Sequence, residues 1–125
     1  MTPEASAYLG KANQCLDYAR TNLSSGVAND AGRNAYLAMF HAAQALIYER
    51  TGKAAKTHQG VHTEFNRIAK AESFDRELGR SLPRMYNLKA VADYETGPDA
   101  VIPLERASAA VDVASRFVAS VVALL

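Results

Sequence analysis

The fold is decided by residues 29–50, which read NDAGRNAYLAMFHAAQALIYER. Apolar side chains recur here at steps of three and four residues, the period of an α-helix with one buried face. Asn29 or Asp30 can cap the start of this helix, and Thr51-Gly52 can end it. The buried face is predicted to consist of Tyr36, Met39, Phe40, Ala43, Leu46 and Ile47.

The same helical period appears in four other segments, and no alternating strand pattern is found. A first helix is predicted to be capped by Thr2 and to begin at Pro3, and another is predicted to follow Thr57. The segment 75–94 contains Pro83, which either kinks one helix or opens a new helix capped by Ser81. The sequence therefore predicts an all-α fold, an antiparallel bundle of four to five helices in a single domain spanning residues 1–125.

The last predicted helix opens at Pro103 and carries two apolar stripes. The first alternates steps of three and four residues, as in a coiled-coil seam. The second lies beside it and exceeds what one bundle contact needs, so we expect it to form a homodimer face. The first stripe is Leu104, Ala107, Val111, Ala114, Val118, Val121 and Leu125, and the second is Ala110, Val113 and Phe117.

Composition limits the classes of function. The formal net charge is +1, so no global field draws the chain to nucleic acid or to an anionic membrane, and any such site must be a local cluster. The lone Cys15 excludes an internal disulfide and fits a reducing compartment. The start MTPEASAYLG lacks the features of a signal peptide, and the strongly apolar run 117–125 is shorter than a membrane span of about 20 residues. We therefore expect a cytoplasmic protein without membrane contact.

The helix at 29–50 also carries candidate functional residues. Arg33 and His41 are eight residues apart, which places them ~80° apart around the helix axis and ~12 Å apart along it. They can line one groove but cannot contact one small atom. His41 is interpreted either as a half-buried ring that bonds a neighbouring helix or as a group for proton transfer, because its ordinary pKa suits that role.

Two further groups stand near helix ends. A basic junction (Arg50, Lys53, Lys56, Thr57, His58 and His62) meets a helix N-terminus, which favours an anion. His58 and His62 have the spacing of zinc ligands but lack the glutamate of the zinc-protease motif, so we predict neither a metal nor a cofactor. In the segment 89–95, two carboxylates stand at the C-terminal end of a predicted helix, where the helix dipole makes negative charge unfavourable. A positive charge from Arg33 or Lys56 can offset this unfavourable interaction.

Three segments together resemble the HEPN domain family (higher eukaryotes and prokaryotes nucleotide-binding domain). They are residues 34–43 (NAYLAMFHAA), residues 56–61 (KTHQGV) and residues 92–95 (ADYE). The resemblance spans about residues 5 to 122 and is closest to short stand-alone prokaryotic members. It implies a helical bundle that pairs as a homodimer and often accompanies a small nucleotidyltransferase in a toxin–antitoxin module.

Active family members are metal-independent ribonucleases with an arginine and a histidine four to six residues apart, one pair from each subunit. The resemblance implies that Arg33 and His41 are catalytic, although seven residues lie between them and Asn34 stands at the six-residue position. It implies nucleotide or RNA binding by Asn34, Lys56 and His58. The cleft would be ordered by Tyr36, Asp93, Tyr94 and Glu95, with Tyr94 as a possible acceptor of a nucleotidyl group.

Two classes of function therefore stay open. The first is a toxin-like HEPN protein that binds nucleotide or RNA and cleaves RNA without a metal. The second is a catalytically inactive helical module whose polar residues only orient helices for partner binding. Metal-dependent hydrolysis through His58 and His62 is a third, weaker hypothesis.

Overall fold

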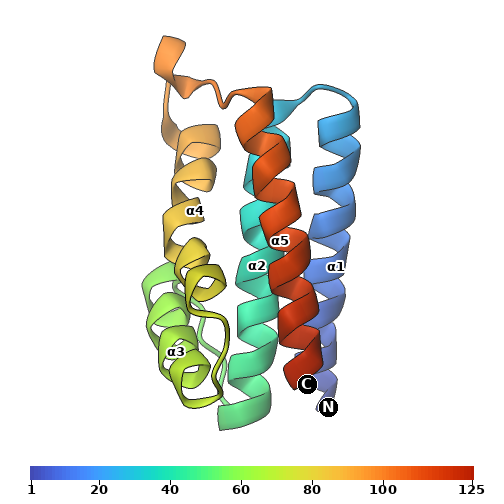
Figure 1. Cartoon of the computed structure of the whole chain (residues 1–125), viewed down its shortest axis with the longest axis vertical. Coiled ribbons are helices and arrows are strands. Elements are labelled where there is room, and N and C mark those ends of the chain that lie inside the picture. The colour runs from blue at the N-terminus through green and yellow to red at the C-terminus, as the bar shows by residue number, and fades with distance from the viewer.

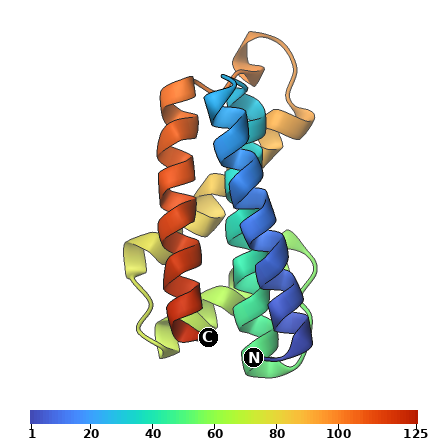
Figure 2. The ribbon, with the colours of Figure 1, turned by 90° about the vertical axis from the view of Figure 1, so that its right-hand side faces the viewer.

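A computed structural model describes residues 1–125, except for the side chain of Asp99. Its five α-helices and one 3-10 turn confirm the predicted all-α bundle, and the described residues contain no strand. The long helices α1, α2 and α5 lie side by side, while α3 and α4 cover one flank and both termini lie at the same end (Figure 1, Figure 2). The elements are α1 Pro3–Ser24, α2 Ala28–Thr51, α3 His58–Ala71, α4 Arg76–Tyr94, η1 Pro98–Ala100 and α5 Leu104–Leu124.

Helix α2 forms the centre of the bundle and packs against α1, α3, α4 and α5. All six residues predicted for its buried face are buried, so the helical period identified the core correctly. Helices α1 and α2 pack antiparallel to each other. Thr2 N donates to Glu49 Oε1 at one end, and Asn34 Nδ2 donates to Asn22 Oδ1 at the other.

Most predicted helix ends are confirmed. Thr2 Oγ1 accepts from Ala5 N at the start of α1, Thr57 Oγ1 accepts from Gly60 N at the start of α3, and Gly52 ends α2 with φ 70°. The predicted cap of α2 is wrong, because α2 begins at Ala28 without a side-chain cap. Asn29 instead bonds the segment before α5, donating to Ala100 O at 2.6 Å and accepting from Ile102 N at 2.8 Å.

Helix α4 is one helix, and Pro83 lies within it. Its cap is Asp75, whose Oδ1 accepts from Leu78 N at 2.7 Å. The alternative of a new start at Ser81 is wrong, because the Ser81 hydroxyl donates to the carbonyl of Leu78 inside the helix. This proline removes one backbone donor and leaves the rest of the helix continuous.

Apart from Leu104, which is exposed, both predicted stripes of α5 face the core of this chain. Ala110 and Phe117 of the second stripe are buried and Val113 is half-buried, so α5 lacks the surplus apolar face from which a homodimer was predicted. The homodimer itself stays a prediction. By length and composition alone α5 could cross a membrane, which the shorter run 117–125 did not indicate. Seven of its 21 residues are buried against the rest of the bundle.

Candidate functional site

His41 lies half-buried on the outer side of α2. Its Nδ1 is 2.7 Å from Gln44 Oε1, and Gln44 Nε2 donates to Ala55 O at 3.0 Å. The second bond fixes the orientation of the amide, because only its nitrogen can donate to a carbonyl. Nδ1 of His41 therefore carries the proton in the neutral ring. Nε2 is then the free base, and it has no hydrogen-bond partner among the residues that the structure describes.

The surroundings of His41 keep the ring neutral. Burial lowers its pKa, the Gln44 hydrogen bond opposes that change, and the charges of Lys11 and His58 lower the pKa further. Lys11 stands on α1 and was not identified from the sequence. The antiparallel pairing of α1 with α2 could have indicated it, because that pairing is what places the middle of α1 against this part of α2. The ring is therefore in the neutral form, which is the form that can accept a proton.

Three charged residues form a second group, the Asp93 cluster (Arg33, Lys89 and Asp93), which joins α2 to α4. Arg33 Nε donates to Asp93 Oδ1 at 2.7 Å, and Lys89 Nζ donates to Asp93 Oδ2 at 2.8 Å. Burial acts to raise the pKa of Asp93, but the Lys89 hydrogen bond and the two positive charges outweigh it and lower the pKa. Arg33 is therefore the expected partner of this carboxylate, while its side chain stays 39% exposed.

Tyr94 lies at the edge of the Asp93 cluster. Lys89 Nζ is 3.2 Å from the Tyr94 hydroxyl and 4.7 Å from the centre of its ring. The residue is nevertheless 69% exposed, so its hydroxyl can be reached from solvent. Glu95, the next residue, is exposed and forms no ion pair with any residue that the structure describes.

Tyr36 organises a third group, the Tyr36 junction (Tyr36, His58 and His62), between α2 and α3. The buried hydroxyl of Tyr36 lies 2.8 Å from His58 Nδ1 and 2.7 Å from His62 Nε2. It can donate to only one of these nitrogens, so it must accept from the other. Burial, and then Tyr86, raise the pKa of Tyr36, so the phenol stays protonated. Tyr36 thus orders His58 rather than the Asp93 cluster.

The remaining candidates are dispersed. Asn34 bonds Asn22 between α1 and α2, and Lys56 is exposed before α3. His58 approaches His41 only through Phe40, whose ring centre is 4.5 Å from that of His58 and 5.4 Å from that of His41. The structure therefore arranges the candidates as three adjoining groups rather than as one cleft.

The proposed zinc ligands have another role in this arrangement. His58 and His62 direct their neighbouring nitrogens at a phenol, whose high pKa makes it a poor metal ligand. Within the described part of the chain, no group of three or more His, Cys, Asp or Glu side chains is placed to hold a metal ion. The Tyr36 junction is instead a hydrogen-bonded contact between helices.

The bundle and the motifs at 34–43, 56–61 and 92–95 agree with a match to the HEPN domain model over residues 5–124. The chain belongs to the HEPN domain family. It is 32% identical over 85 residues to a "UPF0332 protein" of Thermotoga maritima and 33% identical over 94 residues to a protein of Methanocaldococcus jannaschii named "Putative toxin MJ0605". These matches cover 67% and 74% of this chain.

The matches cover 64% of the Thermotoga relative, just under two thirds, and 69% of the Methanocaldococcus relative. Membership of the family thus rests on most of this chain. The activity, ligands and partners of this protein have to be argued from its own residues.

Proposed function

We propose that this protein is the toxin-like HEPN component of a nucleotidyltransferase–HEPN pair in the cytoplasm, and that it binds and cleaves RNA without a metal. Membership of the HEPN family and the similarity to a protein named as a toxin support the first part. The arrangement of His41 supports the second.

The observation that carries the proposal is the fixed tautomer of His41. Gln44 holds the proton on Nδ1, so Nε2 is the unprotonated nitrogen and is free of partners among the described residues. In RNA cleavage this nitrogen would accept the proton of a ribose 2′-hydroxyl as that oxygen attacks the adjacent phosphorus. A cation would stabilise the charge that builds on the phosphate oxygens.

Arg33 is the proposed cation. Its Nε is held by Asp93, which leaves the terminal guanidinium nitrogens available to a phosphate. Because Arg33 and His41 lie ~12 Å apart along one helix and Asp93 holds Arg33 Nε, the proposal places one phosphate between two copies of α2 that face each other. The proposed active form is therefore a homodimer in which Arg33 of one protomer acts with His41 of the other.

The companion nucleotidyltransferase would regulate the protein by contact or by modification of Tyr94. The hydroxyl of Tyr94 accepts from Lys89, and the residue is exposed, so a partner enzyme could reach it. In such a transfer the phenol oxygen attacks the α-phosphorus of a nucleoside triphosphate, diphosphate leaves, and the phenol proton passes to a base of the transferase. The bulky anion formed beside Lys89 and Arg33 would disturb the Asp93 cluster.

The test is cleavage of single-stranded RNA in EDTA by the native protein, His41→Ala and Arg20→Gln. Arg20 lies on α1, is exposed, and pairs with Asp17, so its substitution removes a cation elsewhere. We expect the native protein and Arg20→Gln to cleave in EDTA, and His41→Ala to lose at least about 100-fold in rate, the usual contribution of an acid–base group. Cleavage by His41→Ala at the native rate would contradict the proposal.

A second function is supported by the Asp93 cluster itself. Arg33 and Lys89 both bond one carboxylate. Charge pairing of this kind can have a purely structural role, which here is to join α2 to α4. The protein would then be an inactive module that binds its partner through the bundle. No RNA cleavage by the native protein, together with no binding of nucleotide, would support this alternative.

A further inference from the structure

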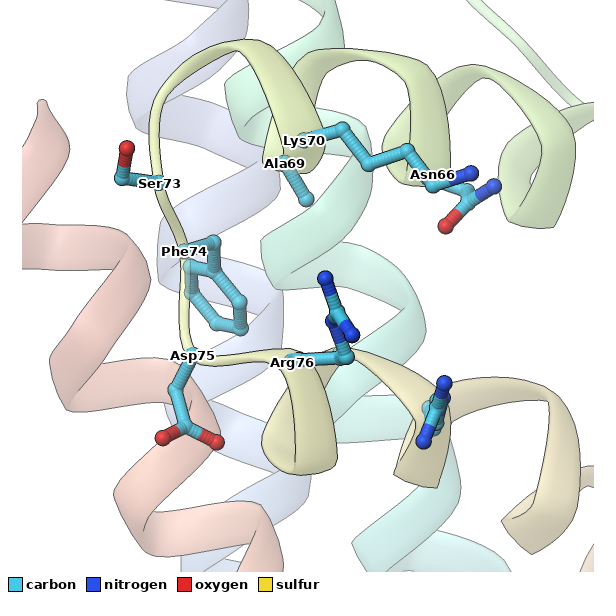
Figure 3. Close-up of a pocket in the computed structure, with 9 residues that line it drawn as sticks. Asn66, Ala69, Lys70, Ser73, Phe74, Asp75 and Arg76 are labelled. Carbon is cyan, nitrogen blue, oxygen red and sulfur yellow. The ribbon is translucent and has the colours of Figure 1, made fainter.

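A groove outside all three groups runs between α3 and α4. It has a volume of about 760 Å³ and is lined by Asn66, Ala69, Lys70, Ser73, Phe74, Asp75, Arg76, Gly79 and Arg80. Figure 3 shows Lys70 and Asn66 on the α3 side and Arg76 on the α4 side, with Phe74 between the two helices. This volume is in the range of sites that hold a small organic ligand.

The groove continues along α3 toward the Tyr36 junction. A second hollow of about 340 Å³ shares Asn66, Gly79 and Arg80 with it and ends at Gln59 and His62. His62 is the residue whose Nε2 bonds Tyr36. The two hollows therefore adjoin, and the second extends from the α3–α4 groove to His62.

The charge in the groove is unbalanced. Three cations line it, and Asp75 is the lining carboxylate. Asp75 is already engaged as the cap of α4, where its Oδ1 accepts from Leu78 N. Arg80 has a long ion pair of 3.4 Å with Glu77, which is outside the lining, whereas Lys70 and Arg76 have no ion pair with any described residue. Such a groove attracts an anion with several charges.

The neutral residues of the groove indicate which anion. Asn66 and Ser73 supply hydrogen-bonding groups, and Phe74 supplies an aromatic surface. Phe74 is fixed from behind by edge contacts with Phe65 and Phe117, at ring-centre distances of 5.2 Å and 5.4 Å. Cations that follow a groove, together with an aromatic ring on which a base can stack, are typical of sites for single-stranded nucleic acid.

We propose that the α3–α4 groove binds single-stranded RNA, with phosphates on Lys70, Arg76 and Arg80 and a base against Phe74. The inference deepens the proposed function and rests on it for the choice of RNA as the polyanion. His41 does not line the groove, and the adjoining hollow would allow the strand to extend from the groove toward His62. Binding and cleavage are therefore assigned to different surfaces.

The test measures binding of a fluorescent 2′-O-methyl oligouridylate by anisotropy at several salt concentrations. This probe has the phosphates and bases of RNA but no free 2′-hydroxyl, so it is not cleaved and binding is measured separately from catalysis. Lys70→Gln/Arg76→Gln removes two groove cations. The control, Arg20→Gln/Arg106→Gln, removes the same charge from exposed positions outside the groove. Heat denaturation confirms that both double variants are folded.

We expect the groove variant to bind the probe at least about tenfold more weakly than the control, since charge-assisted hydrogen bonds to phosphate are among the stronger ones. The slope of log K against log salt should fall by about 0.7 for each phosphate that the variant no longer neutralises. The proposal would be overturned if the groove variant and the native protein had equal affinities and slopes. It would also be overturned if the groove variant and the control lost the same affinity. Groove-dependent binding without cleavage of ordinary RNA would refute catalysis by His41 and leave the groove in place.

Discussion

Tyr36→Phe should destabilise the protein through the loss of one oxygen atom. The substitution keeps the buried ring, which packs 5.5 Å from the Tyr86 ring, and removes the hydroxyl that bonds His58 at 2.8 Å and His62 at 2.7 Å. The two bonds hold α3 against α2, so their loss acts on the packing of these helices. No cavity larger than a hydroxyl is created.

The magnitude follows from the number of bonds and from the exposure of the partners. Each intramolecular hydrogen bond contributes about 0.5–1.5 kcal/mol, so two contribute about 1–3 kcal/mol. Both histidines are half-buried, and water can replace part of what the phenol supplied, which favours the lower half of this range. For 125 residues the entropy of unfolding is about 0.26 kcal/mol/K, so a loss of about 1–2 kcal/mol lowers Tm by about 4–8 °C.

Heat and urea denaturation measure this effect, and Tyr86→Phe is the matched control. Tyr86 packs on the same rings, with its centre 4.8 Å from that of His58, but its hydroxyl bonds no residue that the structure describes. We expect Tyr86→Phe to change the free energy of unfolding by less than about 0.5 kcal/mol. If both variants lose the same stability, the Tyr36 junction does not join the helices as argued.

Two further predictions concern charge. Asp93→Asn should lower the free energy of unfolding, measured in urea, by about 1–2 kcal/mol. This value lies between those typical of exposed and of buried ion pairs, because the Lys89 side chain is only 11% exposed and loses its carboxylate partner. Glu95→Gln, an exposed neighbour, should be neutral. Burial lowers the pKa of all three histidines, so the folded state disfavours their protonation. Their contribution to stability is complete above about pH 6.5 and is lost as the pH falls through the lowered values, so unfolding in urea should become easier from about pH 7 to 5. A stability that is flat or rises over this interval would contradict the lowered pKa values.

Most of the fold could be predicted from the sequence, because the signals that start and end a helix lie in neighbouring residues. The caps Thr2 and Thr57 and the stop at Gly52 depend on residues within one helical turn, and all three are found as predicted. The failures involve contacts that are distant in sequence. Asn29 has the side chain of a cap, yet that side chain bonds Ala100 and Ile102, more than 70 residues away. The two stripes of α5 exceed what one bundle contact needs, but the number of helices that pack around α5 cannot be read from its own residues.

The candidate site was less predictable for the same reason. The spacing of Arg33 and His41 on one helix could be calculated, but Lys11 and Gln44 act on His41 only through packing that spacing does not reveal. Tyr36 was assigned to the same cleft as Asp93, although the two residues belong to different groups. The Asp93 cluster was anticipated in part, since Arg33 was one of two cations expected to offset that carboxylate.

The geometry of α2 limits which cation can act with His41 on one phosphate. This helix is unbroken from Ala28 to Thr51, so rotation of side chains does not close the ~12 Å axial separation of Arg33 and His41. Chemistry that uses both residues on one phosphate is therefore favoured by a second copy of the chain, but α5 does not provide the apolar face for that contact. Lys11 is the alternative, because its charge already lowers the pKa of His41 within one chain. If Lys11 supplies the positive charge, the departure of the Arg33–His41 spacing from the family motif loses its importance, and cleavage by a monomer becomes physically possible.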